Sequence, residues 1–245
     1  MISKEEQHGD LYAVVITDTG ISHRLSNTPN QDAVLYAFME DDFVLAVSDG
    51  VGSCPKAALG SKMAVRAAVK VFEQIRQNRC QKHELPQRLI AEWTSLLNGE
   101  KLDDCCATLK IAMKLYDRMV LVSLGDGVLV MTSNGLKVKA PSDEMPFANQ
   151  TRCLSSFVSS KEIWIEEVHL DLHISYVVFM CTDGIANGLR DGSEYELVRE
   201  IEENTPTEKL KDELELLTID ISDFSLDDRT LGVVKCECKN AGPER

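Results

Sequence analysis

Four short apolar segments follow one another between residues 107 and 140, with little polar sequence between them. The segments span residues 107–116, 118–127, 128–134 and 136–140. Such short, closely spaced runs are typical of strands in an antiparallel meander. A chain that contains this stretch is therefore expected to build at least one antiparallel sheet.

Other segments with strand character lie on both sides of this meander. Their apolar runs are short and favour β-branched and aromatic residues. They span residues 11–17, 33–39, 43–48, 163–170, 175–183 and 229–237. The polar triplet Glu40-Asp41-Asp42 has the length of a hairpin turn between two of them.

Helical patterns are fewer than strand patterns. From Gly60 to Ile75 the apolar residues recur at helical spacing, which predicts a helix whose start Ser53 could cap. Further helices are expected over residues 85–97 and after two capping boxes that begin at Ser193 and Thr205. Because the strands are grouped and do not alternate with helices, the sequence predicts an α+β layered sandwich.

The overall composition excludes several classes of protein. A net charge of −14 argues against nucleic acid and anionic membrane as partners, because both require basic surfaces. No apolar run approaches the roughly 18 residues of a membrane span, and the polar first ten residues do not resemble a signal peptide. We therefore expect a cytoplasmic protein whose eight cysteines are free thiols.

The domain organisation is expected to be simple. The 245 residues contain no internal repeat, no low-complexity segment and no linker. A chain of this length can bury a large core without disulfides. We expect a single domain over residues 1–245, in which the irregular stretch 141–161 forms a long loop or flap.

Five aspartates stand where a predicted strand stops or a loop begins. They are Asp32, Asp49, Asp126, Asp183 and Asp227, and glycine follows three of them directly. One Asp-Gly pair is most simply a turn, but three such pairs at the ends of apolar runs are harder to explain in that way. If these carboxylates converge they must repel one another unless cations neutralise them. Oxygen-rich clusters of this kind suit Mg²⁺ or Mn²⁺, and two such ions can activate water for attack on phosphorus.

The motifs around these aspartates resemble those of a known family. The ordered set is QDA (31–33), SDGVGS (48–53), ATL (107–109), GDG (125–127), TDG (182–184) and DDRT (227–230). In order and rough spacing it resembles the metal-dependent protein phosphatase family (PPM, protein phosphatase type 2C), over nearly the whole chain. The segments SHRLSNTPNQDA and MPFANQTRCLSS resemble a bacterial subgroup of that family. The resemblance implies a four-layer α-β-β-α sandwich of two antiparallel sheets flanked by helices.

The resemblance also implies a role for each acidic residue. Asp49 would bridge two Mn²⁺ or Mg²⁺ ions and the carbonyl of Gly50 would bind one of them. The second ion would be completed by Asp183 and Asp227, and Asp126 would help Asp183 to hold a third, weaker ion. Asp32 would hold metal-bound water and orient the nucleophile, so that Asp32 and Asp49 are the expected catalytic residues.

Two positions depart from the family pattern. Many relatives carry a phosphate-binding arginine where this chain has Asn27, so His23 and Arg24 are the candidates for substrate binding. His23 could equally be a structural histidine hydrogen-bonded to its loop. Asp228 stands where the family usually has asparagine, which leaves Asp227 and Asp228 as alternative metal ligands; the family pattern favours Asp227.

The function implied by the resemblance is hydrolysis of phosphoserine and phosphothreonine in proteins. The expected partner is a phosphoprotein substrate, so that the chain would counter a serine/threonine kinase. One alternative is a catalytically inactive PPM-fold module with a regulatory or binding role. Another is a two-metal phosphoesterase that acts on small molecules.

Overall fold

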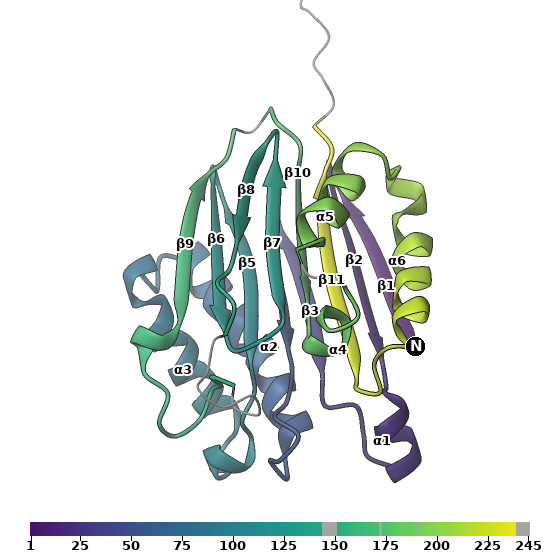
Figure 1. The fold of residues 1–245 in the computed structure, drawn as a ribbon. Coiled ribbons are helices and arrows are strands. Elements are labelled where there is room, and N and C mark those ends of the chain that lie inside the picture. Colours follow the sequence, from purple (N-terminus) through teal and green to yellow (C-terminus); the bar gives the residue numbers. More distant parts are fainter. Residues whose placement is uncertain (144–150, 172, 191, 239–245) are drawn as a thin grey trace, which may run out of the picture.

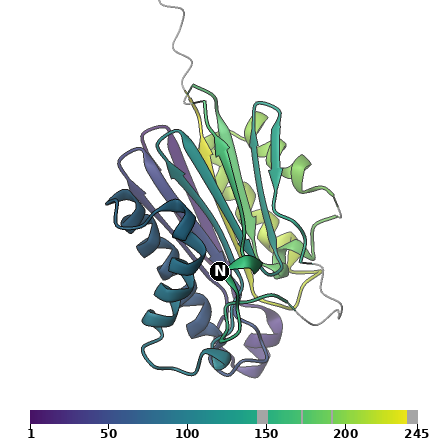
Figure 2. The same cartoon turned by 90° about the vertical axis from the view of Figure 1, so that its left-hand side faces the viewer.

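The computed structural model describes residues 1–143, 151–171, 173–190 and 192–238. It contains two antiparallel sheets that pack face to face, with helices on both outer sides (Figures 1 and 2). The six-stranded sheet has the order β1 (Ile2–His8), β2 (Leu11–Asp18), β11 (Arg229–Cys236), β10 (Tyr176–Cys181), β7 (Val128–Ser133) and β8 (Leu136–Lys139). The five-stranded sheet has the order β3 (Ala33–Met39), β4 (Asp42–Ser48), β5 (Leu109–Leu115), β6 (Arg118–Leu124) and β9 (Trp164–His169).

The helices lie outside the sheets and divide into two groups. One group, α2 (Ala57–Arg76) and α3 (Leu85–Leu96), covers the five-stranded sheet. The other, α5 (Glu194–Glu203) and α6 (Thr207–Ile221), covers the six-stranded sheet. The short helices α1 (Ile21–Ser26) and α4 (Asp183–Ala186) lie at one end of the sandwich (Figure 1). This arrangement confirms the predicted α+β sandwich with four layers.

Three apolar layers separate these four structural layers. Between the sheets, Phe43 and Leu45 of β4 lie in one buried cluster with Val178 of β10. Under the first helix group the largest buried side chain is Trp93, whose indole N–H donates to the carbonyl oxygen of Gly60 at 3.1 Å. This hydrogen bond matters because a buried indole N–H without an acceptor is costly. The core is thus built by all the predicted apolar runs together.

Most predicted elements are present, but their starts are not where the capping signals placed them. Helix α2 begins at Ala57 and no side chain caps it, so the expected cap by Ser53 is wrong. The Ser193 hydroxyl donates to the carbonyl oxygen of Arg190 at 2.6 Å, and Thr205 donates to Glu213 at 2.9 Å. No side-chain cap hydrogen bond forms at the start of α5 or α6, so neither expected capping box is present.

Strand β1 was not expected, because its sequence is polar. It pairs with β2 along its whole length, from Ile2 opposite Thr17 to His8 opposite Leu11. Nearly all of its side chains are exposed, which is how an edge strand can lack an apolar pattern. Residues 144–150 of the expected loop lie outside the described residues, and the single-domain assignment stays a prediction.

Within the part of the chain that the structure describes, no helix has the length and apolar character that crossing a bilayer requires.

Candidate metal centre

The five predicted aspartates come together at one end of the sandwich, the end marked by α1 and α4 in Figure 1. A cavity of about 260 Å³ opens there. Asp32 is 94% buried and does not line the cavity, although its carboxyl interacts with that of Asp49. The cavity lining comprises Ser22, His23, Gln31, Asp49, Gly50, Val51, Gly52, Thr108, Asp126, Thr151, Asp183 and Asp227.

Local backbone geometry explains the glycines beside these acids. Asp126 sits in the turn between β6 and β7, where Gly125 and Gly127 both adopt φ of 84°. This left-handed conformation is unfavourable for other residues. Gly184 serves a different purpose, since a Cβ there would lie 1.9 Å from the carbonyl oxygen of Asp228. Asp126-Gly127 is therefore part of a turn, whereas Asp183-Gly184 begins α4 at a point where two motif segments touch.

Electrostatics show that the carboxyls lie close to one another. Burial raises the pKa of Asp32 to about 7 and that of Asp183 to about 6. Burial, followed by the charges of Asp32 and Asp183, raises the pKa of Asp49 well above its ordinary value. Burial also raises the pKa of Asp126, and the charge of Asp126 contributes to the raised values of Asp49 and Asp183. At neutral pH such a cluster favours any bound cation.

Hydrogen bonds fix the backbone of the acids and leave several carboxylate oxygens available. The Asp49 amide donates to Thr108 Oγ1 at 3.0 Å, and the Asp126 amide donates to Thr151 Oγ1 at 3.1 Å. Among the described residues, Asp126 Oδ1 is buried and has no hydrogen-bond partner. Neither Asp49 nor Asp183 forms an ion pair with a described lysine or arginine. This set of oxygen donors fits hard divalent cations such as Mg²⁺ and Mn²⁺.

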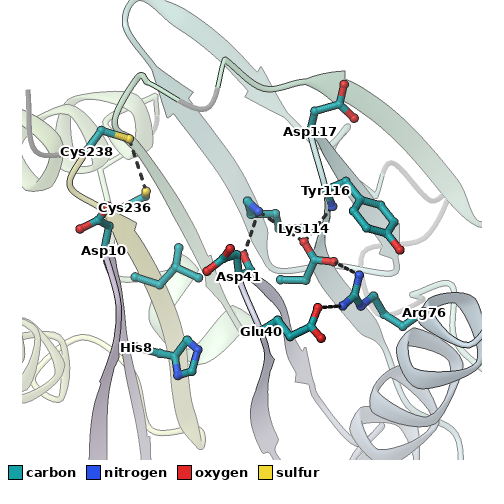
Figure 3. A pocket seen from close by; sticks show the side chains of 12 residues that line it. His8, Asp10, Glu40, Asp41, Arg76, Lys114, Tyr116, Asp117, Cys236 and Cys238 are labelled. Atoms are coloured by element: carbon teal, nitrogen blue, oxygen red, sulfur yellow. Dashed lines mark hydrogen bonds and ion pairs between the residues drawn. The ribbon is translucent and has the colours of Figure 1, made fainter. Parts of the chain in front are cut away.

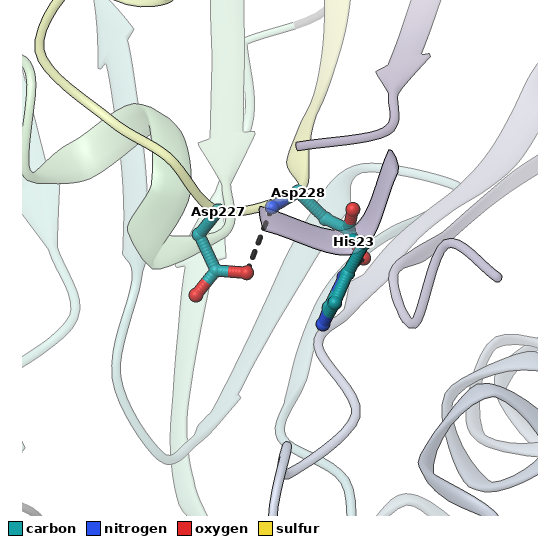
Figure 4. Close-up of side chains that lie close together, drawn as sticks. All are labelled: His23, Asp227 and Asp228. Atoms are coloured by element: carbon teal, nitrogen blue, oxygen red, sulfur yellow. Dashed lines mark hydrogen bonds and ion pairs between the residues drawn. The ribbon is translucent and has the colours of Figure 1, made fainter. Parts of the chain in front are cut away.

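The neighbouring acids Asp227 and Asp228 have different environments (Figure 4). Asp228 is 2% exposed. Its Oδ1 accepts from the Gly20 amide at 2.7 Å, and its Oδ2 accepts from the Gln31 amide at 2.6 Å and contacts His23 Nδ1 at 2.8 Å. Asp227 is exposed and lines the cavity. The ligand atoms of His23, Asp227 and Asp228 lie within 4.8 Å of one another, but the oxygens of Asp228 are already occupied, which favours Asp227 as the ligand.

The two candidates for substrate binding point to different places. His23 lines the cavity, where its contact with Asp228 fixes the ring. Arg24 does not line the cavity, and its guanidinium donates to Asp18 at 2.6 Å. Apart from His23, no basic side chain is among the described residues of the cavity lining. The structure thus brings only His23 of the pair to the acids.

Sequence reasoning missed three residues that support the site. The Thr182 hydroxyl donates to the Asp32 carboxylate at 2.8 Å, and Asn30 accepts from the Asp32 amide at 2.8 Å. Lys110 is buried, and its ammonium donates to Ser123 at 2.8 Å and to the Gly125 carbonyl at 2.5 Å. Burial lowers the pKa of Lys110 to about 8, and Asp126 opposes this effect. Thr182 belongs to the TDG motif and Lys110 to the apolar run 107–116, but nothing in the sequence distinguished these side chains from ordinary strand residues.

A larger cavity of about 490 Å³ lies at the opposite end of the sandwich (Figure 3). Its buried carboxylate, Asp42, contacts Lys114 at 3.3 Å and Arg76 at 2.9 Å. None of the predicted site residues lines it. Size alone would favour this larger cavity as the functional site, whereas the converging acids favour the smaller cavity. We assign the site to the smaller cavity because its converging acids have no counter-charge of that kind.

Comparisons with known proteins agree with this fold. A sequence profile of the protein phosphatase 2C family matches residues 19–217. The chain belongs to this family of metal-dependent serine/threonine phosphatases, which confirms the resemblance found in the sequence. No curated protein matches the sequence.

Solved structures share the fold at low sequence identity. A bacterial serine phosphatase bearing an R161K mutation has a TM-score of 0.69 and 17% identity, covering 94% of this chain and 99% of its own. The serine/threonine phosphatase Stp1 from Staphylococcus aureus has a TM-score of 0.67 and 18% identity, covering 92% and 94%. RsbX in complex with magnesium has a TM-score of 0.61 and 14% identity, covering 96% and 100%. At such identities these neighbours establish the fold alone.

Proposed function

We propose that this chain is an active phosphatase that hydrolyses phosphoserine and phosphothreonine in proteins with the help of two bound divalent ions. The observation that carries the proposal is the convergence of Asp32, Asp49, Asp126 and Asp183, with Asp227 at the edge of the same cavity. Such a group of acids is electrostatically unfavourable by itself and becomes favourable around cations.

The proposed ligand roles are those that the resemblance to the family implies, and all the residues concerned line the cavity. Asp49 would bridge both ions, and the Gly50 carbonyl would bind one. Asp183 and Asp227 would complete the second, and Asp126 with Asp183 would hold a third. Bound Mn²⁺ or Mg²⁺ would neutralise the phosphoryl oxygens and lower the pKa of a bound water.

The protein itself would hold and orient the reactants. Asp32 accepts a hydrogen bond from the Thr182 hydroxyl at 2.8 Å and interacts with Asp49, through which it would act on the attacking water. His23, held by Asp228, would face the phosphoryl group from the α1 side of the cavity. Arg24 is paired with Asp18, so its part in substrate binding would require that pair to open.

One observation favours the alternative of an inactive regulatory module. The described lining of the cavity contains no lysine or arginine to bind the phosphate. In our proposal the ions themselves replace that contact, because they provide the positive charge that the phosphoryl group needs. The proposed physiological role is to counter a serine/threonine kinase by acting on its phosphoprotein products.

The test is hydrolysis of a phosphoserine peptide and of para-nitrophenyl phosphate, with Mn²⁺ and with chelator. Wild-type protein should turn over both substrates only with metal, and Asp49→Asn and Asp183→Asn should abolish turnover. Asp212→Asn, an exposed acid on α6, serves as the matched control and should retain activity. Turnover in chelator would contradict the two-metal mechanism. Metal binding by calorimetry without any turnover would favour the regulatory module.

A further inference from the structure

Large apolar side chains are exposed beside the mouth of the metal cavity. On α1, Leu25 is 84% exposed and Ile21 is 39% exposed. On the segment between α6 and β11, Phe224 is 78% exposed and Leu226 is 65% exposed. We call these four residues the rim patch. Scattered single apolar residues are normal on a protein surface, but a group at one place suggests a binding surface.

The two halves of the rim patch are held together by backbone contacts. The Ser22 amide and hydroxyl both donate to the Leu226 carbonyl oxygen, at 3.1 and 2.8 Å. A Cβ on Gly20 would lie 2.3 Å from the carbonyl carbon of Asp227, so the two segments touch directly. The two segments that carry the rim patch are therefore neighbours in space, although about 200 residues separate them in the sequence.

Ion pairs to the buried Asp18 link the two segments of this surface. Asp18 at the end of β2 accepts from Arg24 of α1 at 2.6 Å and also from Arg229 at the start of β11. One carboxylate thus anchors both segments that carry the rim patch. A surface ordered before binding loses less conformational entropy when a partner docks.

The rim patch is continuous with the cavity. Ser22 and His23 line the cavity and lie between Ile21 and Leu25 on α1. Asp227 lines it from the other segment, directly after Leu226. A peptide with its phosphorylated residue in the cavity would therefore extend over the rim patch with its neighbouring residues.

The charge of the protein indicates which side chains of such a peptide would contribute to binding. A net charge of −14 gives no long-range attraction for an anionic phosphopeptide. Affinity must then come from the ions and from apolar contact, which salt does not screen. Asp220 and Asp223 beside Phe224 are exposed, and neither has an ion pair with a described residue. They suit a basic side chain on the bound segment.

We infer that the rim patch is the docking surface for the substrate: a phosphoprotein segment with an apolar residue next to the phosphorylated serine or threonine and a basic residue beyond it. The inference rests on the proposed function and adds to it the class of sequence that the site selects. Apolar burial against Leu25, Phe224 and Leu226 is its main source of affinity.

The test compares a rim variant, Leu25→Ser with Phe224→Ser and Leu226→Ser, with the wild type. Substrates are a phosphoserine peptide with leucine beside the phosphoserine and lysine beyond it, the same peptide with serine in place of leucine, and para-nitrophenyl phosphate. We expect kcat/KM on the leucine peptide to fall by about tenfold through KM, as the loss of one apolar anchor implies. Hydrolysis of para-nitrophenyl phosphate should stay within about twofold, since it is too small to reach the rim patch.

The matched control is Leu216→Ser with Ile219→Ser on the outer face of α6, where the side chains are 58% and 53% exposed. It should leave all three activities unchanged. Equal losses on the peptide and on para-nitrophenyl phosphate, or no loss on either, would overturn the inference. A wild-type dimer that the rim variant converts to monomer in sedimentation would identify a second copy of the chain as the occupant and overturn it as well.

Binding measurements separate this inference from the proposed function. If the wild type hydrolyses no substrate, the proposed function fails, and fluorescence anisotropy with the labelled leucine phosphopeptide and Mg²⁺ still tests the rim patch. Binding that the rim variant weakens by about tenfold supports docking without catalysis. Binding that the rim variant leaves unchanged overturns docking.

Discussion

The two ends of the sandwich treat buried acids in opposite ways. At the far end, Asp42 is 3% exposed and is neutralised within the chain by Lys114 at 3.3 Å and Arg76 at 2.9 Å. At the cavity end, Asp49 and Asp183 lie among other carboxyls, and burial and those neighbours raise their pKa values.

This difference in nearby charge helps to distinguish a structural acid from a candidate metal ligand. Both kinds stand at strand ends, with Asp42 buried and Asp49 and Asp183 half-buried, so position at a strand end does not separate them. What separates them is the charge nearby, because a buried carboxylate needs either a cation from the chain or one from solution. Among the described residues, neither Asp49 nor Asp183 has an ion pair with a lysine or arginine, although the buried Lys110 acts on Asp126, so we expect these two carboxylates to depend on cations from solution.

The strongest test of this difference between the two ends is to replace one acid at each end and to measure catalysis. Asp49→Asn should lower kcat/KM on para-nitrophenyl phosphate by about 10³-fold, because it would remove the ligand proposed to bridge the ions. Asp42→Asn should lower it by less than about threefold in the protein that remains folded. Steady-state kinetics at saturating Mn²⁺ measure both. Similar losses in the two variants would contradict the assignment.

The same pair should have opposite effects on stability in chelator. Asp42→Asn should lower the free energy of unfolding by about 3 kcal/mol, since it leaves the Lys114 and Arg76 cations without their shared partner. Asp49→Asn should raise it, because a repulsive charge is removed from the cluster. Urea unfolding followed by tryptophan fluorescence gives both values. A lower free energy of unfolding for metal-free Asp49→Asn would contradict the idea that repulsion between the carboxylates destabilises the cluster.

The pH dependence of the stability of the metal-free protein should be set by the acids at the cavity end. Asp32 and Asp183 have raised pKa values, about 7 and about 6, because burial opposes their ionisation. The folded protein therefore keeps protons that the unfolded chain releases near its ordinary pKa of about 4. Their contribution to stability is complete below that pH and is lost as the pH rises through about 6 and 7.

The midpoint of thermal unfolding in chelator, taken between pH 5 and pH 8, measures this loss of stability. Addition of Mn²⁺ should restore the stability most strongly near pH 8. The Asp32→Asn variant should show a smaller decline. A metal-free midpoint that rises over this interval would contradict the predicted direction, provided that the protein stays monomeric.

The smallest effect should separate the two candidates for substrate binding. His23→Ala should lower kcat/KM on para-nitrophenyl phosphate by about tenfold, because the side chain lines the cavity. Arg24→Ala should change it by less than about twofold, since its guanidinium is directed to Asp18. A larger effect for Arg24→Ala than for His23→Ala would reverse the assignment.

Much of the fold was readable from the sequence because its apolar runs are interrupted at strand length. The failures had local causes. Strand β1 exposes almost all its side chains, so its polar sequence resembles a disordered start. The capping motifs at Ser193 and Thr205 are real as patterns, but their hydroxyls bond to other groups in the folded chain. A short motif does not reveal such competition.

The candidate site was readable as a set of acids, but its geometry was not. Nothing in the pair Asp227-Asp228 tells which carboxylate faces the cavity, since the answer depends on the distant amides of Gly20 and Gln31 that occupy Asp228. In the same way, only the folded chain shows that Arg24 turns towards Asp18. Tertiary contacts determine which of two adjacent identical acids faces the cavity and where a long flexible side chain points. Sequence spacing does not reveal those contacts.

The position of β11 has a consequence for the synthesis of the protein. This strand, residues Arg229–Cys236, is the last in the described chain, yet it lies between β2 and β10 in the middle of its sheet. Until it leaves the ribosome, β2 and β10 have no strand to join them, and Asp227 just before it is missing from the metal centre. A nascent or truncated chain without this strand therefore cannot close the six-stranded sheet or complete the acidic cavity.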